Sequence, residues 1–323
     1  ALNDYPPKTA GAFVRGNAWL SSPLMRRWHP DIVHETYFSP LPTGLTQLDV
    51  KSESFTPRVV TVFDMISEIE LSTSKDADTD MRHSAKYAAV KRADHVVCIS
   101  EHTRNDLLKF FGVSAEKTSV IHLGCDVPKI RAQDTSQTLH ARPYLLYVGL
   151  RSGYKNFAML LQAIASSIEI KRDFDLIAFG GNTFTAEESQ LIAQLGFHSG
   201  QVRQSVGSDL ELNKLYAHAA GFVYPSTYEG FGLPPLEAMA HNCPVISSNT
   251  SSMPEVIGEA AQYFDPTSIE SMRSAIAAVL YNPSRANELR AMGQKRIQGF
   301  TWKQCAQKTL RLYQSLTASS VKD

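Results

Sequence analysis

The sequence has 323 residues, 43% of them hydrophobic and 20% charged, with 32 Lys and Arg balanced by 32 Asp and Glu. This composition is typical of a soluble globular protein, and the length allows two domains that each bury a core. The formal net charge of zero, with no basic run longer than Arg26-Arg27, argues against nucleic acid as a partner. No apolar run approaches the roughly 20 residues that cross a bilayer, so we expect a cytoplasmic protein, at most peripheral on the inner membrane face.

The four cysteines, Cys98, Cys125, Cys243 and Cys305, are widely spaced and include no Cys-x-x-Cys pair. This pattern argues against a zinc site and against a disulfide framework, so we expect buried thiols. The histidines show no metal-ligand spacing either. The sequence therefore predicts no metal centre.

The first part of the chain alternates strand and helix patterns. Short β-branched runs bounded by Pro or polar residues predict buried parallel strands, and a helical repeat of apolar residues ends at Gly112. The polar stretch 133–140 predicts a linker, so we place a domain boundary near residue 140. The strands are expected at 31–34, 58–63, 95–99 and 119–123, and the helix at 106–111.

The second part repeats this rhythm, which predicts an α/β protein with a doubly wound parallel sheet that binds ligands at the carboxyl ends of its strands. We expect one Rossmann-like domain at 1–140, a second at 141–300, and a last helix within 301–323 that packs back on the first domain through Trp302. The strands are expected at 144–148, 174–179, 202–206, 221–224, 244–247 and 261–264, and the helices at 155–168, 186–195, 209–219, 236–241, 253–257, 268–280, 283–293 and 302–316.

One motif, at residues 228–239, joins a predicted strand to a predicted helix and reads Tyr-Glu-Gly-Phe-Gly-Leu-Pro-Pro-Leu-Glu-Ala-Met. Gly230 and Gly232 let the backbone approach a ligand, and the amino end of the helix suits a phosphate. Glu229 and Glu237 can face one site as acceptors for sugar and ribose hydroxyls. The alternative is a plain strand-to-helix turn with packed glycines and solvated carboxylates.

A second motif, at residues 148–156, reads Val-Gly-Leu-Arg-Ser-Gly-Tyr-Lys-Asn and follows another predicted strand. Its turn at Gly149 brings Arg151 and Lys155 to a helix start, where a cation is unfavourable unless an anion binds. Arg can grip phosphate oxygens with two N–H groups and Lys adds a point charge, so the pair can hold a diphosphate without a metal ion. The alternative is a pair of solvated cations.

Together with Pro244-Val245-Ile246 and residues 251–256, these motifs resemble the signature of family 4 glycosyltransferases with the GT-B fold, from about residue 30 onward. The resemblance implies two Rossmann-like domains with a cleft between them. It also implies a nucleotide-diphosphate sugar as substrate, with no cofactor, and an acceptor that is a glycan or a lipid-linked glycan. Because no strand and Gly-rich loop precede residues 31–34, the amino-terminal domain is expected to be incomplete.

The resemblance assigns roles to residues of both motifs. It implies that Glu229 contacts donor-sugar hydroxyls and that Glu237 binds the ribose. It further implies that Arg151 and Lys155 contact the donor β-phosphate behind the turn at Gly149. The backbone amides of Phe231, Gly232 and Leu233 would hold sugar and phosphate.

Two residues of the first domain complete the predicted site. Asp64 follows a strand whose family counterpart often ends in Val-His-Asp, and here Phe63 stands in place of the His. We consider Asp64 as the polar group near the reacting carbon, with a turn-capping Asp as the alternative. Ser100 resembles a family step that lines the cleft, with a helix cap as the alternative.

The forms Asp64-Met65-Ile66 and Arg151-x-x-Tyr154-Lys155-Asn156 resemble bacterial mannosyltransferases of surface-polysaccharide assembly. They imply a retaining transferase that uses GDP-mannose, with UDP-sugars as the second choice. The alternatives are a non-catalytic or truncated nucleotide-sugar binding protein and, further off, a GT-B phosphorylase or an epimerase.

Overall fold

The computed structural model describes residues 30–36, 38, 56–72, 84–126 and 142–319. Two compact units make up the chain, one of residues 1–122 with 305–323 and the other of residues 123–304. The boundary predicted near residue 140 and the predicted linker lie in 127–141, outside the described residues. The segment before residue 30, on which the expectation of an incomplete domain depends, also lies outside them.

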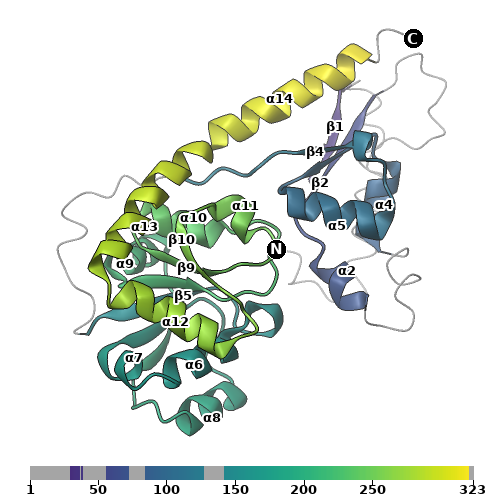
Figure 1. The fold of residues 1–323 in the computed structure, drawn as a ribbon. Coiled ribbons are helices and arrows are strands. Elements are labelled where there is room, and N and C mark those ends of the chain that lie inside the picture. The colour runs from purple at the N-terminus through teal and green to yellow at the C-terminus, as the bar shows by residue number, and fades with distance from the viewer. Residues whose placement is uncertain (1–29, 37, 39–55, 73–83, 127–141, 320–323) are drawn as a thin grey trace. The chain divides into compact units, whose positions relative to one another are not determined.

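The first unit holds a four-stranded parallel sheet in the order β1-β2-β3-β4. Its core is formed by residues such as Val60, Val96 and Leu107, between the sheet and the helices α4 and α5. Figure 1 shows these elements in purple to blue. In chain order the elements are β1 (Val33–Glu35), β2 (Arg58–Val62), α2 (Ile66–Leu71), α4 (Ala85–Arg92), β3 (His95–Cys98), α5 (Glu101–Phe111), η2 (Ala115–Lys117) and β4 (Thr118–Val120).

The last helix, α14 (Trp302–Ser319), begins in the second unit and from Cys305 onward belongs to the first. Its residues Leu312, Tyr313 and Leu316 pack against a small core around Val59. Trp302 itself is 47% exposed, so the prediction that this residue anchors the helix is wrong. The anchor is the apolar stripe one to four turns further along, because only that side of the helix faces the sheet.

The second unit holds a six-stranded parallel sheet in the order β10-β9-β8-β5-β6-β7. The chain starts at the central strand β5, builds outward to β7 and then returns to β8 on the other side of β5. The point where the direction reverses therefore lies between β5 and β8. The strands are β5 (Tyr144–Val148), β6 (Asp175–Phe179), β7 (Val202–Ser205), β8 (Gly221–Tyr224), β9 (Val245–Ser248) and β10 (Ala261–Phe264).

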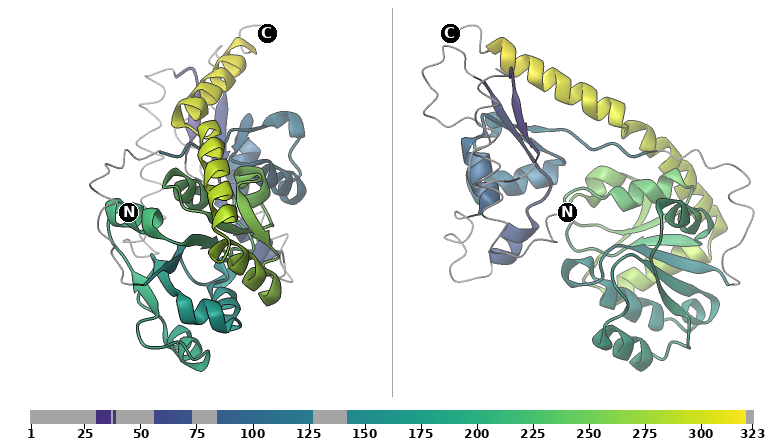
Figure 2. Two further views of the ribbon diagram at one scale, coloured as in Figure 1. Left: turned by 60° about the vertical axis from the view of Figure 1, so that its left-hand side comes forward. Right: turned by 180° about the vertical axis from the view of Figure 1, so that it is seen from behind.

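Helices cover both faces of this sheet (Figures 1 and 2). Tyr147 packs on Phe157 of α6, whereas the hydroxyl of Tyr144 donates to Leu215 O of α9 at 2.8 Å. Side chains three apart on a strand point to opposite faces, so α6 and α9 lie on opposite faces. The helices are η4 (Gly153–Lys155), α6 (Phe157–Ala165), α7 (Ile168–Asp173), α8 (Ala186–Gln194), α9 (Asp209–His218), α10 (Leu233–Ala240), α11 (Met253–Ile257), α12 (Ile269–Leu280), α13 (Pro283–Arg296) and η5 (Ile297–Gly299).

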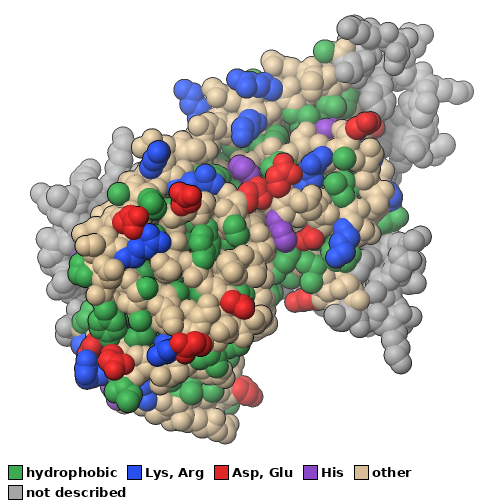
Figure 3. Space-filling view, viewed as in Figure 1, with side chains coloured by type: hydrophobic (Ala, Val, Ile, Leu, Met, Phe, Trp, Pro, Cys, Tyr) green, Lys and Arg blue, Asp and Glu red, His purple; other side chains and the backbone are tan. Residues whose placement is uncertain are grey.

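The α/β fold class with two parallel sheets is confirmed, and each predicted strand has a counterpart. The helix predicted at 155–168 is confirmed only in part, because α6 occupies Phe157–Ala165 and the elements η4 and α7 share the two ends of the span. Asn156 has φ 59°, which ends η4, and Ser167 caps a new helix by accepting from Ile170 N. The helices α2 and α4 were not predicted. Both signs of charge are spread over the face drawn in Figure 3.

Candidate functional site

The loops after β5 and β8 meet in an ion pair. Lys155 Nζ lies 2.6 Å from Glu229 Oε1, and the two side chains are 17% and 10% exposed. One residue follows β5 and the other follows β8, so the pair lies at the point where the strand order reverses. Open parallel sheets bind their ligands at that point, outside the carboxyl ends of the strands.

Glu229 is held in place by its neighbours on the β8 loop. Its side chain is hydrogen-bonded to that of Tyr224, the fully buried last residue of β8. Its N–H donates to Ser251 Oγ at 2.8 Å, and its carbonyl accepts from Ser252 Oγ at 2.8 Å. Ser252 Oγ also lies 2.9 Å from Phe231 O, so one buried hydroxyl joins two residues of the motif. This glutamate is therefore fixed before any ligand arrives.

The segment that carries Lys155 is anchored by the residue after it. Gly149 opens the segment with φ 133°, which a side chain rarely tolerates, and Asn156 closes it in the left-handed region. The side-chain Nδ2 of Asn156 donates to Pro225 O at 3.1 Å and to Pro266 O at 2.9 Å. Lys155 is thereby tied to the loops after β8 and β10.

Helix α10 starts directly after the motif glycines. Gly232 is its N-cap with φ 110°, and Leu233 begins the helix. Because Pro234 and Pro235 have no N–H, only Leu233 and Leu236 carry amides among the first four helical residues. The helix begins three residues earlier than predicted. The amino end of α10 thus carries few free amides beside the dipole of the helix.

Glu237 has a tyrosine partner of its own. Tyr216 OH donates to Glu237 Oε2 at 3.1 Å, and the tyrosine ring stacks on His241 with centroids 5.5 Å apart. Burial raises the pKa of the Glu237 carboxyl, whereas the tyrosine hydrogen bond acts in the opposite direction. Each motif glutamate therefore lies beside a fully buried tyrosine.

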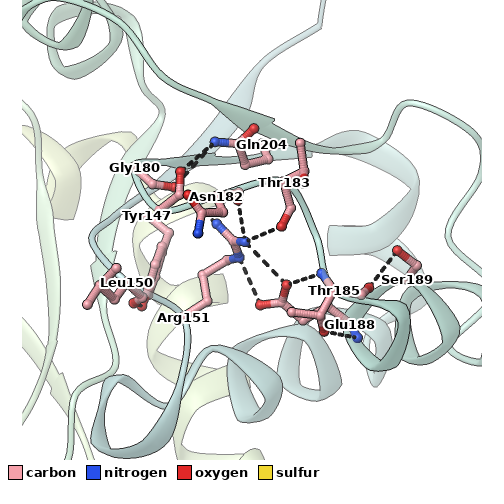
Figure 4. A network of polar contacts seen from close by, with 11 residues as sticks. Tyr147, Leu150, Arg151, Gly180, Asn182, Thr183, Thr185, Glu188, Ser189 and Gln204 are labelled. Carbon is pink, nitrogen blue, oxygen red and sulfur yellow. Dashed lines mark hydrogen bonds and ion pairs between the residues drawn. The ribbon is translucent and has the colours of Figure 1, made fainter. Parts of the chain in front are cut away.

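Arg151 has different partners from those the sequence suggested (Figure 4). Its Nε and Nη2 lie 2.8 and 3.2 Å from the two carboxylate oxygens of Glu188. Nη1 donates to Gly180 O at 3.0 Å, and Nη2 donates to Asn182 O at 2.6 Å and Thr183 O at 3.2 Å. The guanidinium is thus committed to the loop after β6 and to α8.

We predicted that Arg151 and Lys155 act together on one diphosphate. In the structure Arg151 pairs with Glu188, and Lys155 pairs with Glu229. The Arg151 side chain is 5% exposed, and a phosphate could reach its fork only by displacing the carboxylate of Glu188. A carboxylate with bidentate geometry is as good a partner for a guanidinium as a phosphate, which is why composition and spacing could not separate the two.

The two predicted residues of the first unit take the capping alternatives. Asp64 Oδ1 accepts from Ile66 N at 3.1 Å, and Lys86 Nζ donates to Asp64 O at 3.0 Å. Ser100 is fully buried, and its Oγ accepts from Thr103 N at 3.0 Å as the N-cap of α5. The helix-cap alternative for Ser100 is therefore present in the structure, and its donor-binding role stays a prediction.

The expectation of buried thiols is confirmed for three of the cysteines. Burial raises the pKa of the Cys98, Cys125 and Cys243 thiols to about 12, so they are protonated at neutral pH. Cys305 is half-buried. Among the residues with assigned positions, no group of three His, Cys, Asp or Glu side chains is placed to hold a metal ion. Within the same residues, no helix has both the length and the apolar character needed to cross a bilayer.

Sequence reasoning assigned no role to four residues that shape the site: Tyr224, Tyr216, Asn156 and Glu188. Local signals existed for two of them. Asn156 directly precedes an apolar helical run, and Glu188 stands three residues after Thr185, which is the spacing of a capping box. The tyrosines carried no signal, because their partners come from other elements.

Comparison with known proteins places this geometry in context. Residues 130–296 match the family model "Glycosyl transferases group 1", and residues 3–129 match "Glycosyltransferase Family 4". O-antigen chain mannosyltransferase B of Escherichia coli is 30% identical over 270 residues, which cover 80% of this chain and 71% of that protein. An MMP alpha-(1->4)-mannosyltransferase of Mycolicibacterium hassiacum is 28% identical over 310 residues, 91% of this chain and 72% of that protein.

The fold is also similar to that of a solved structure. Sucrose-phosphate synthase from Thermosynechococcus elongatus superposes with a TM-score of 0.76 at 21% identity, covering 98% of this chain and 81% of that one. At this identity the likeness concerns the fold alone.

Proposed function

Because this chain belongs to the family 4 glycosyltransferases and carries a group 1 glycosyltransferase domain, we propose that it transfers mannose from GDP-mannose to a glycan or lipid-linked glycan with retention of configuration. The observation that carries the proposal is the Lys155–Glu229 ion pair, at the point of the second sheet where strand order reverses. The choice of mannose is supported by two relatives that are named mannosyltransferases.

In the proposed reaction the donor displaces the Lys155–Glu229 contact. The ammonium of Lys155 turns to the diphosphate, where it compensates the negative charge that grows as the nucleotide leaves. Glu229, held by Tyr224 and the two serines, accepts hydrogen bonds from the donor-sugar hydroxyls. Two groups that satisfy each other without ligand thus exchange one partner each for a ligand group, which limits the cost of desolvation.

The proposed retention of configuration rests on the resemblance to family 4 glycosyltransferases. The acceptor oxygen bonds to the anomeric carbon on the face from which the diphosphate departs, as the bond between that carbon and the phosphate oxygen breaks. The acceptor proton passes to the departing phosphate. Neither Lys155 nor Glu229 forms a covalent bond in this proposal.

The remaining parts of the proposal concern the surroundings of the reaction. Glu237 binds the ribose, with Tyr216 holding one of its oxygens. The charge compensation by Lys155 makes a divalent metal unnecessary, so a chelator should leave activity unchanged. We place the reaction in the cytoplasm, with an acceptor that can lie at the inner membrane face.

Calorimetric titration with GDP, UDP and ADP tests the donor site. We expect GDP to bind most tightly, and Lys155→Ala to weaken it about tenfold or more, since a charge-assisted hydrogen bond contributes about 1.5–3 kcal/mol. Lys171→Ala is the matched control, because that ammonium donates to Leu195 O elsewhere in the same unit. Equal GDP affinity in wild type and Lys155→Ala would refute the assigned role of this lysine.

A transfer assay tests the rest. Release of GDP from GDP-mannose together with a mannosylated product of unchanged anomeric configuration supports the proposal. Tight GDP binding without transfer to any glycan or lipid-linked glycan would favour a binding protein instead. Preference for a UDP-sugar would overturn the assignment of the donor.

A further inference from the structure

Arg151 joins the loops that follow two neighbouring strands. It lies just beyond β5, while its partners Gly180, Asn182 and Thr183 follow β6, and Glu188 lies in the first turn of α8. Figure 4 shows the guanidinium pointing into the β6 loop, with Glu188 on its other side. The side chain therefore fixes the path of the loop that leads to Lys155.

The ion pair with Glu188 is shielded from solvent and geometrically constrained. The side chains are 5% and 19% exposed, and the guanidinium carbon lies 4.9 Å from the ring centroid of Phe184. The Oε2 atom of Glu188 also accepts from Thr185 N at 2.8 Å in the capping box of α8. Glu188 is thus fixed by its own helix, and a two-point contact transmits that position to Arg151.

The β6 loop is shaped to receive the guanidinium. Gly181 has φ +67°, and a Cβ at this position would lie 2.9 Å from Arg151 Nη1. Gln204 on β7 donates to Gly181 O at 3.2 Å, so the carboxyl end of a third strand supports the same loop. The network joins the ends of β5, β6 and β7 into one polar cluster.

We propose that Arg151 and Glu188 are positioning residues, which hold the segment 149–155 so that Lys155 faces Glu229, and that Arg151 does not contact the donor phosphate. Because the carboxylate of Glu188 compensates the guanidinium charge, neutralisation of the diphosphate falls to Lys155. This inference rests on the proposed donor site, but the contacts on which it depends belong to the ligand-free chain.

A double-mutant cycle on GDP affinity separates the two roles. A positioning pair predicts that Arg151→Gln and Glu188→Gln each weaken GDP about tenfold, and that the double variant is no weaker than either. A direct phosphate contact predicts that only Arg151→Gln weakens GDP, while Glu188→Gln leaves affinity unchanged or tightens it. The second pattern overturns the inference.

Arg151→Lys is a second variant with a different readout. An ammonium cannot span Glu188 and the carbonyls of the β6 loop, so it should fail to restore GDP affinity. Affinity close to wild type in Arg151→Lys would point to a phosphate ligand and overturn the inference. Asp175→Asn is the matched control, because Asp175 pairs with Arg203 at 3.0 Å at the opposite end of β6. It should reduce stability without changing GDP affinity.

Amide hydrogen exchange of the ligand-free chain tests the positioning without any nucleotide. Exchange in residues 149–156 should be faster in Arg151→Gln and Glu188→Gln than in wild type, and unchanged in Asp175→Asn. Unchanged exchange in both pair variants overturns the inference, whether or not GDP binds. If wild type binds no nucleotide but exchange rises as expected, the positioning holds and the proposed donor site fails.

Discussion

Lys155 and Glu229 stand 74 positions apart in the chain, yet Nζ of the lysine lies 2.6 Å from Oε1 of the glutamate. The contact exists because β5 and β8 are neighbours in the sheet although β6 and β7 come between them in sequence. Each side chain compensates the charge of the other in the ligand-free protein. Removing either member should therefore have an effect that depends on which ligand group is present.

We expect Glu229→Gln to separate nucleotide binding from sugar transfer. The change leaves Lys155 without its carboxylate, so GDP, which has no sugar, should bind as tightly as to wild type or more tightly. Transfer from GDP-mannose should fall about a hundredfold, since a charged acceptor for the sugar hydroxyls is lost. Calorimetry with GDP and steady-state transfer rates measure the two effects.

The matched control for this variant is Glu270→Gln, which removes an exposed carboxylate paired with Arg273. It should change neither quantity, because exposed pairs contribute little. If Glu229→Gln and Glu270→Gln give the same transfer rate, Glu229 has no part in sugar recognition.

Tyr224→Phe should cost both stability and transfer activity. The variant removes the hydroxyl beside Glu229 and leaves a buried carboxylate with one partner fewer, which should lower the free energy of unfolding by about 1–3 kcal/mol. Urea unfolding and kcat/KM are the measurements. Tyr144→Phe removes a hydroxyl that donates 2.8 Å to Leu215 O, so it should lose stability alone. Equal activity in both variants would argue against a positioning role for Tyr224.

Glu237→Gln should change how stability depends on pH. Burial raises the pKa of the folded-state carboxyl, so the protonated form is favoured on folding, and the stability from this group is present at low pH and lost as pH rises through the folded pKa. A glutamine stays neutral, so the variant should unfold at a higher temperature than wild type at pH 7. The difference should shrink as pH falls towards 4.5, the ordinary value for Glu.

Melting curves between pH 4.5 and 8 test this expectation. Glu259→Gln, at an exposed position, is the control and should follow wild type throughout. A variant that melts below wild type at pH 7 would mean that the Tyr216 hydrogen bond outweighs burial in the folded protein.

Substitutions of Asn156 should reduce the stability of the chain because the side-chain amide is lost, not because the side chain becomes smaller. Asn156→Gly keeps the left-handed backbone at no steric cost but loses the bonds to Pro225 O and Pro266 O, which should destabilise the chain by about 1–3 kcal/mol. Asn156→Ala should lose about 1 kcal/mol more through backbone strain.

The exposed Asn242, with φ 58°, provides the comparison. Asn242→Gly should leave stability nearly unchanged, and Asn242→Ala should lose only the cost of the backbone strain. Urea unfolding of the four variants measures these losses in the free energy of unfolding. Equal losses in Asn156→Gly and Asn242→Gly would contradict a special role for the Asn156 amide.

Much of the fold follows from local pattern. The run at β5 and the run at β8 are short, apolar and bounded by turn residues, and both strands occur where expected. The helix predicted across 155–168 shows the limit of this approach, because apolar periodicity continues through a span that Asn156 and Ser167 interrupt. The Asn156 side chain donates to carbonyls on other loops, and the Ser167 side chain caps the next helix.

The candidate site was less predictable than the fold. Spacing marked Arg151, Lys155 and Glu229 as polar groups in loops after strands and Glu237 as one in the helix that follows. Spacing carries no information on partners. Lys155 and Glu229 turned out to contact each other, whereas Arg151 pairs with Glu188 of α8. Asp64 and Ser100 satisfied backbone N–H groups of their own turns, which is the commonest use of such residues.

The sequence by itself determined the alternation of strands and helices, the turns at Gly149 and Gly232, and the presence of cations and carboxylates at strand ends. These depend on propensities and on backbone conformations that a few neighbouring residues set. Only the tertiary structure decided which charges meet, because the order of strands in the sheet brings loops together from distant parts of the chain. A carboxylate is a suitable partner for any nearby cation, so geometry chose Glu229 for Lys155 and Glu188 for Arg151.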